Sequence, residues 1–118
     1  MSAINGRAMK AKGSAFEREV VAYLKSHGFP FAERHYGAGR PADVGDVDGV
    51  VGFTIECKAH KALDLAGWTD EAERERVNGR RRFAAVVAKR RCKPVAQSYV
   101  VMNLATFTRL VADDKVTS

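Results

Sequence analysis

The residues of this chain that could do chemistry are charged groups placed inside apolar stretches. The segment Phe53-Thr-Ile-Glu-Cys-Lys58 is typical of a core β-strand, apart from one carboxylate and one amine. Side chains alternate along a strand, so Glu56 and Lys58 project to one face and Cys57 to the other. Two adjacent charges on a buried strand carry a desolvation cost unless both are used. The pattern therefore indicates a functional site.

A second carboxylate, Asp46, opens the preceding apolar segment. Asp46 and Glu56, on neighbouring strands, would supply the one or two carboxylates that protein-bound Mg²⁺ prefers. The backbone carbonyl near Cys57 could add another oxygen. Such an ion activates water near neutral pH and stabilises the transition state of phosphodiester cleavage, with Lys58 orienting the water or steadying the charge. We therefore expect a magnesium site, at which Mn²⁺ can substitute.

The elements that must position these residues follow from hydrophobic periodicity and turn signals. Helices are expected at about 14–27, where Ser14 and Glu17 fit a capping box, at 69–78 with Thr69 as N-cap, and at 105–112. Strands are expected at about 29–36, 46–51, 53–59, 83–88 and 98–103. The order αβββαββα predicts an α/β fold with a mixed central sheet flanked by helices.

A chain of 118 residues is the size of one domain. We expect this domain to span 13–112, with a flexible basic arm at 1–12 and a frayed tail at 113–118. No stretch approaches the roughly 20 apolar residues that cross a bilayer, and the N-terminus lacks a signal-peptide core. The expectation is a cytoplasmic protein, in the host cytoplasm if viral, with free cysteines and no membrane partner.

The formal net charge of +6 and the pI near 9.6 favour a polyanionic partner. Basic runs at 80–82 and 89–91 flank the strand expected at 83–88. A charge run is usually a solvated face, but here the runs lie beside a suspected phosphodiesterase centre, which favours phosphate contacts. The acidic stretch 70–75 is interpreted as a solvated helix face with local ion pairs.

Together these motifs resemble the PD-(D/E)XK nuclease superfamily, and within it the archaeal-type Holliday junction resolvases and their phage relatives. The resemblance extends from about Lys12 to Leu110. It rests on Lys-Gly-Ser-Ala-Phe-Glu-Arg-Glu at 12–19, Arg34 before a glycine-containing loop, Gly-Asp at 45–46 and Ile-Glu-Cys-Lys at 55–58.

The resemblance implies a restriction-endonuclease-like fold and a homodimer that cuts four-way DNA junctions. The implied catalytic residues are Glu17, Asp46, Glu56 and Lys58, with the carboxylates and the Cys57 carbonyl as metal ligands. Arg18 and Arg34 match the family's phosphate contacts. The full set of residues expected to bind DNA is Lys12, Arg18, Arg34, Arg40, Lys61, Arg81 and Arg90.

Several alternatives stay open. The family often has Pro before its aspartate, whereas Gly45 precedes Asp46 and Pro41 lies near Asp43, so Asp43 and Asp48 are competing candidates. The substrate could be other DNA, as in a nicking, restriction-like or repair nuclease, or the chain could be a non-enzymatic nucleic-acid-binding module. The loop at 37–39 is too short for a nucleotide fingerprint, so no nucleotide cofactor is expected.

Overall fold

In a computed structural model, the described part of the chain forms three α-helices and one five-stranded sheet. The structure describes the backbone of residues 2–35 and 44–117, and the side chains of 13–35 and 44–113. The elements in order are α1 (Ser2–Lys25), β1 (Glu33–Arg34), β2 (Val47–Asp48), β3 (Phe53–Lys58), α2 (Leu65–Asn78), β4 (Phe83–Ala88), the 3₁₀ helix η1 (Val95–Gln97), β5 (Tyr99–Val101) and α3 (Leu104–Thr117). None of the helices in these residues combines the length and apolarity needed to cross a bilayer.

The strands lie in the order β1-β2-β3-β4-β5. The β3 and β4 strands are parallel, with Glu56 opposite Val86, and the other neighbouring pairs are antiparallel. Parallel neighbours need a crossover, and α2 supplies it. The prediction of an α/β fold with a mixed sheet is therefore confirmed.

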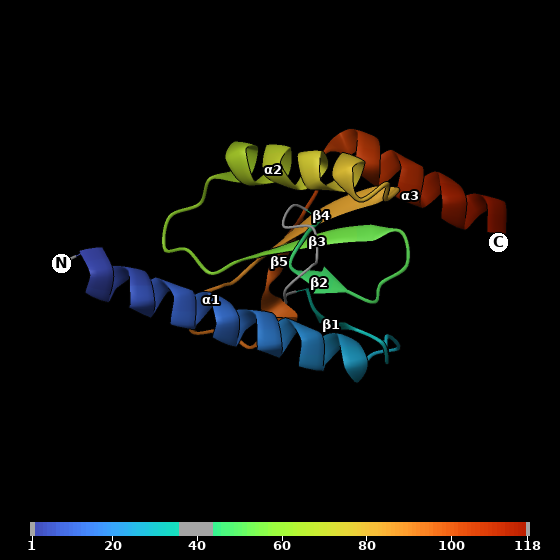
Figure 1. The fold of residues 1–118 in the computed structure, drawn as a ribbon. Coiled ribbons are helices and arrows are strands. Elements are labelled where there is room, and N and C mark those ends of the chain that lie inside the picture. The colour runs from blue at the N-terminus through green and yellow to red at the C-terminus, as the bar shows by residue number, and fades with distance from the viewer. Residues whose placement is uncertain (1, 36–43, 118) are drawn as a thin grey trace.

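Helices cover both faces of this sheet, with α1 on one face and α2 and α3 on the other (Figure 1). On the α1 face, Phe16 and Val20 pack against Ile55 and Cys57 in one buried cluster. On the α2 face, the buried cluster includes Trp68, Ala72, Ala84, Val86 and Ala88. The alternation predicted for β3 is thus observed, and the side chain of Glu56 projects toward α2.

Two helix starts differ from the sequence prediction. Helix α1 begins at Ser2, so residues 2–12, predicted as an arm, continue the helix; alanine, lysine and methionine in this segment favour that conformation. Ser14 is consequently inside the helix, and its Oγ accepts a hydrogen bond from Arg34 at 3.2 Å.

Helix α2 begins at Leu65, because Asp64 caps it by accepting from the Gly67 N–H at 3.0 Å. Thr69, the predicted cap, lies one turn inside.

Other bounds also differ. Helix α3 continues to Thr117, past the predicted end at 112. The β1 and β5 strands are shorter than predicted, and η1 was not predicted. The β1 and β5 strands lie at the two edges of the sheet, where each has a partner strand on one side only. Their apolar composition alone is therefore a poor guide to the residues at which they begin and end.

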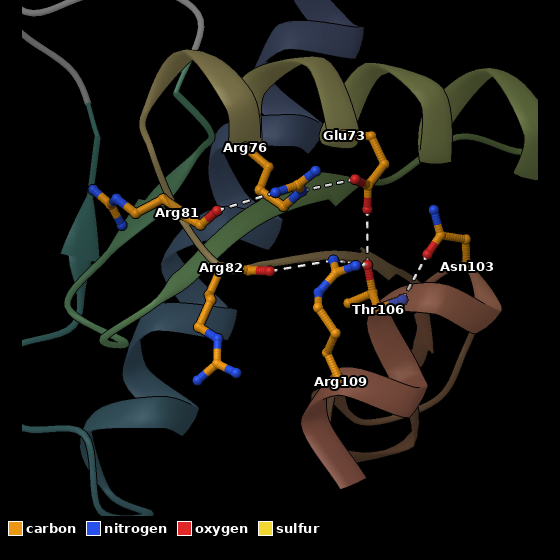
Figure 2. A network of polar contacts seen from close by, with 7 residues as sticks. All are labelled: Glu73, Arg76, Arg81, Arg82, Asn103, Thr106 and Arg109. Atoms are coloured by element: carbon orange, nitrogen blue, oxygen red, sulfur yellow. Dashed lines mark hydrogen bonds and ion pairs between the residues drawn. The ribbon is translucent and has the colours of Figure 1, made fainter. Parts of the chain in front are cut away.

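A polar network ties α2 to α3 and to the turn before β4 (Figure 2). The carboxylate of Glu73 accepts hydrogen bonds from Arg76 Nε at 2.7 Å and from Thr106 Oγ1 at 2.9 Å. Arg109 donates to Thr106 Oγ1 at 3.0 Å and to the Arg82 carbonyl at 3.3 Å. Because Thr106 is fully buried, this network fixes the position of α2 on the sheet.

Candidate metal centre

Three carboxylates converge between β3 and α2. Glu56 comes from the centre of β3, and Glu71 and Glu75 lie one turn apart on α2. One carboxylate oxygen of each residue lies within 4.8 Å of the corresponding oxygens of the other two. Among the described side chains, these three residues form the one group that could hold a metal ion. Glu56 is 4% exposed and Glu75 8%, whereas the Glu71 side chain is 38% exposed, so two of the three carboxylates are shielded from water.

Burial and crowding change how Glu56 and Glu75 titrate. Burial raises the pKa of Glu56 far above the usual carboxyl range, and a hydrogen bond to Glu75 and the charge of Asp46 raise it further. Burial also raises the pKa of Glu75, while the hydrogen bond from Glu56 lowers it. Burial and the like charges of one site thus favour the protonated form of Glu56 in the metal-free protein.

One carboxylate oxygen of Glu75 also lacks a hydrogen-bond donor among the described residues. Its Oε2 is buried and has no hydrogen-bond partner among the described residues. A buried carboxylate oxygen without a partner is costly, and native proteins seldom retain one without a reason. A divalent cation between the three carboxylates would satisfy this oxygen and allow Glu56 to ionise. Glu56, Glu71 and Glu75 fit Mg²⁺, which takes oxygen ligands.

Lys58 adds a positive charge at the edge of the cluster. Its Nζ lies 2.7 Å from Glu71 Oε1 and 3.7 Å from Glu56 Oε2. Burial acts to lower the pKa of Lys58, but the hydrogen bond from Lys58 to Glu71 and the surrounding carboxylates outweigh it and raise the pKa above its ordinary value. Lys58 is therefore an ammonium ion, suited to stabilising negative charge and unsuited to acting as a base.

Asp46 lies at the edge of β3 that faces β2. Its N–H donates to the Ile55 carbonyl at 2.7 Å, and its Oδ2 accepts from the Cys57 N–H at 2.9 Å. The N–H and C=O of one strand residue point to the same side, so the Cys57 carbonyl also faces this edge. The charge of Asp46 raises the pKa of both Glu17 and Glu56. Asp46 therefore interacts electrostatically with Glu17 on the α1 face of the sheet and with Glu56 on the α2 face.

Gly45 explains why proline does not precede this aspartate. Its φ is +110°, a conformation that proline, with φ fixed near −65°, cannot adopt. A Cβ at this position would lie 3.1 Å from Thr54 Cγ2 and 3.2 Å from the Ile55 carbonyl oxygen. Glycine therefore allows the backbone to bring Asp46 against β3.

Glu17, the other predicted ligand, lies on α1 and so on the opposite face of the sheet from Glu56. Its Oε1 accepts from Arg34 Nε at 3.0 Å. Burial and then the charge of Asp46 raise the pKa of Glu17, against the lowering effect of Arg34. Of the predicted metal ligands, only Glu56 belongs to the three-carboxylate group.

Neither Glu71 nor Glu75 is predicted as a metal ligand from the sequence. The prediction of a solvated helix face at 70–75 is wrong for Glu75 and incomplete for Glu71. The expected local ion pair does form between Arg76 and Glu73. A signal was present: Trp68, Ala72 and Glu75 follow helical spacing, so Glu75 continues the apolar stripe of α2 that faces the sheet.

The competing aspartates differ in their surroundings. Asp48 Oδ2 pairs with His35 Nδ1 at 2.9 Å, and Asp48 Oδ1 lies 3.8 Å from Arg81. Asp48 is therefore paired with His35 and Arg81, whereas the charge of Asp46 raises the pKa of Glu56. Asp43 lies outside the described residues.

The residues expected to bind DNA are spread over several elements. Arg18 and Lys61 are exposed. Arg34 pairs with Glu17, Arg81 donates to the Phe53 carbonyl at 2.9 Å, and Arg90 lies over the Tyr99 ring at 5.0 Å. Arg40 and the side chain of Lys12 lie outside the described part. Arg34, Arg81 and Arg90 therefore help to hold the fold.

Comparison with known proteins gives no relative. A scan against family models, a search of curated proteins and a search of solved structures each found no match to this chain. The residues and their geometry are therefore the basis for the function proposed below.

Proposed function

We propose that this protein is a divalent-metal-dependent nuclease that hydrolyses phosphodiester bonds in DNA. The observation that carries the proposal is the convergence of Glu56, Glu71 and Glu75 within 4.8 Å, with the Lys58 ammonium 2.7 Å from one of them. Mg²⁺ is the proposed resident ion, and Mn²⁺ is expected to replace it.

Each residue has a defined task in this proposal. When bound, Mg²⁺ supplies a Lewis acid and the charge that lowers the pKa of an attacking water. Glu56, Glu71 and Glu75 would hold the ion, and Glu56 would release its proton as the ion binds. The Lys58 ammonium would attract a phosphate oxygen and stabilise the negative charge that develops there.

Four-way DNA junctions are the proposed substrate, cut by a homodimer. This part of the proposal is supported by the resemblance of residues 12–19, 45–46 and 55–58 to the PD-(D/E)XK junction resolvases. The net charge of +6 supports a polyanionic substrate but does not distinguish a junction from another DNA form. Nucleases that act on nicks, flaps or linear duplexes are the second candidate.

Cleavage assays test the proposal directly. Labelled four-way junction, flap and linear duplex are incubated at one salt concentration with Mg²⁺ or with EDTA. We expect Mg²⁺-dependent cleavage with preference for the junction, and loss of cleavage in Glu71→Gln and Glu75→Gln. Asp70→Asn is the matched control, because Asp70 is an exposed carboxylate on the same helix.

Two outcomes would contradict the proposal in different ways. Cleavage of duplex or flap in preference to the junction would leave the nuclease in place and overturn its junction specificity. Tight DNA binding without cleavage of any substrate would point to a non-enzymatic nucleic-acid-binding module.

A further inference from the structure

A cavity opens beside the candidate metal centre, beyond the ends of β3 and β4. It has a volume of about 290 Å³ and is lined by Ala59, His60, Lys61, Lys89, Arg91 and Cys92. The Lys89 N–H donates to the Lys58 carbonyl at 2.9 Å, so the cavity begins where the strand carrying Lys58 ends. In α/β sheets, the carboxyl ends of parallel strands are the usual place for ligands.

The lining of this cavity is strongly basic. Lys61, Lys89 and Arg91 are exposed, and among the described side chains of 13–35 and 44–113 no carboxylate lies within salt-bridge distance of them. The carboxylates of the metal centre, by contrast, lie beside the Lys58 ammonium, which pairs with Glu71 and Glu56. Three uncompensated cations around one concave site attract an anion.

The residues that line this cavity favour a phosphate group as its ligand and disfavour a metal ion. His60 and Cys92 could ligate a soft cation, but the three neighbouring positive charges oppose one. Lysine and arginine side chains are the usual partners of phosphate oxygens, with arginine able to donate in a bidentate fashion. A volume of about 290 Å³ is at the small end of ligand pockets, so it suits a phosphate with its sugar.

We propose that this cavity binds a phosphate group of the nucleic-acid strand next to the metal centre and so positions the strand for cleavage. The link to cleavage rests on the proposed nuclease function, whereas phosphate binding in the cavity does not. The phosphate is either an internal diester or a terminal monoester, and the experiment below distinguishes them.

The first test compares cation deletions at and beside the cavity. Binding of a fluorescent single-stranded DNA oligonucleotide is measured by anisotropy in EDTA, where cleavage cannot occur. We expect Lys89→Gln and Arg91→Gln each to weaken binding about tenfold and to reduce the slope of log affinity against log salt by about 0.7. Lys93→Gln is the control, because Lys93 is an exposed cation of the same turn that does not line the cavity.

The second test uses the cavity's own thiol. The chain has two cysteines, Cys57 buried and Cys92 exposed in the cavity, so an alkylating reagent reports on Cys92 while Cys57 serves as the internal standard. We expect bound oligonucleotide to slow alkylation of Cys92 by about tenfold at saturation in the wild type. Equal protection by 5′-phosphorylated and 5′-hydroxyl oligonucleotides identifies an internal diester; protection by the 5′-phosphorylated one alone identifies a terminal monoester.

Two results would overturn the phosphate site. One is an equal loss of affinity in Lys93→Gln and in the cavity variants, which would show general attraction only. The other is alkylation of Cys92 that bound oligonucleotide leaves unchanged. Both measurements are independent of cleavage. The phosphate site can therefore be confirmed in a protein that cuts no DNA, and it can be refuted in a protein that is an active nuclease.

Discussion

Glu56 on β3 and Glu75 on α2 each bring a carboxyl oxygen to within 4.8 Å of the other, inside the buried interface between the sheet and the helix. Burial raises the pKa of both carboxyls, and Glu75 Oε2 has no hydrogen-bond partner among the described residues. Such a pair destabilises the metal-free protein once its protons are removed, and a cation relieves it. Stability, pH and metal binding are therefore linked through these two side chains.

The metal-free protein should lose stability as pH rises. The pKa values of Glu56 and Glu75 are both raised in the native state, so above the usual carboxyl range the unfolded chain has lost protons that the native state retains. The free energy of unfolding then falls with increasing pH. Urea unfolding in EDTA should show a lower midpoint at about pH 8 than at about pH 5.5. A midpoint that rises over this interval would show that the pair does not control the pH dependence.

Removing one charge from the pair should stabilise the metal-free protein. Glu75→Gln removes the repulsion of the buried Glu75 carboxylate by the charges of Glu71 and Asp46, and the neutral amide keeps a hydrogen-bonding group in the same space. We expect the free energy of unfolding in EDTA near neutral pH to rise by about 1 kcal/mol. The control Asp70→Asn should change it by less than about 0.5 kcal/mol. Destabilisation by Glu75→Gln would mean that the unpaired oxygen has a partner essential to the fold.

Lys58 should affect the rate of cleavage and spare metal binding. Lys58→Gln removes a cation beside Glu71 and Glu56, so affinity for Mn²⁺ should stay the same or increase. Cleavage should fall about 100-fold, the typical loss for one group that stabilises transition-state charge. Calorimetry and single-turnover cleavage separate the two effects. If Lys58→Gln loses Mn²⁺ binding instead, the lysine has a structural role in assembling the centre.

Glu17 and Glu71 distinguish two possible positions of the metal. Glu71 belongs to the cluster between β3 and α2, whereas Glu17 lies near Asp46 on the α1 face. We expect Glu17→Gln to keep its Mn²⁺ affinity within about threefold, and Glu71→Gln to lose about tenfold or more. The reverse result would place the ion at the Asp46 edge, as the resemblance to PD-(D/E)XK nucleases implies.

The sequence was sufficient to predict the central sheet. Alternation along 53–58 and the continuous apolar run at 83–88 predicted β3 and β4, because strands in the middle of a sheet have both faces buried. The same alternation predicted that Glu56 and Lys58 share a face. Helix α2 was predicted with a late start, because Thr69 resembles a cap as closely as Asp64 does.

The position of the acidic centre could not be derived in the same way. Whether Glu56 meets α1 or α2 depends on which helix covers its face of the sheet, and this is a property of packing at long range. Glu71 and Glu75 look like solvated helix residues in sequence, since acidic groups on a helix usually face water. The spacing from Trp68 and Ala72 puts Glu75 on the apolar stripe of α2, but only the position of α2 over β3 shows that Glu75 meets Glu56 there.

The central claim, that Glu56, Glu71 and Glu75 hold one divalent cation, is tested most directly by calorimetric titration of the metal-free protein with Mn²⁺. We predict one ion bound per chain at about pH 7.5, with release of protons seen as a dependence of the heat on the buffer, since the ligands must deprotonate. Glu75→Gln should abolish this binding, and Asp70→Asn should leave it intact. No binding by the wild type, or equal binding by Glu75→Gln, would contradict the account.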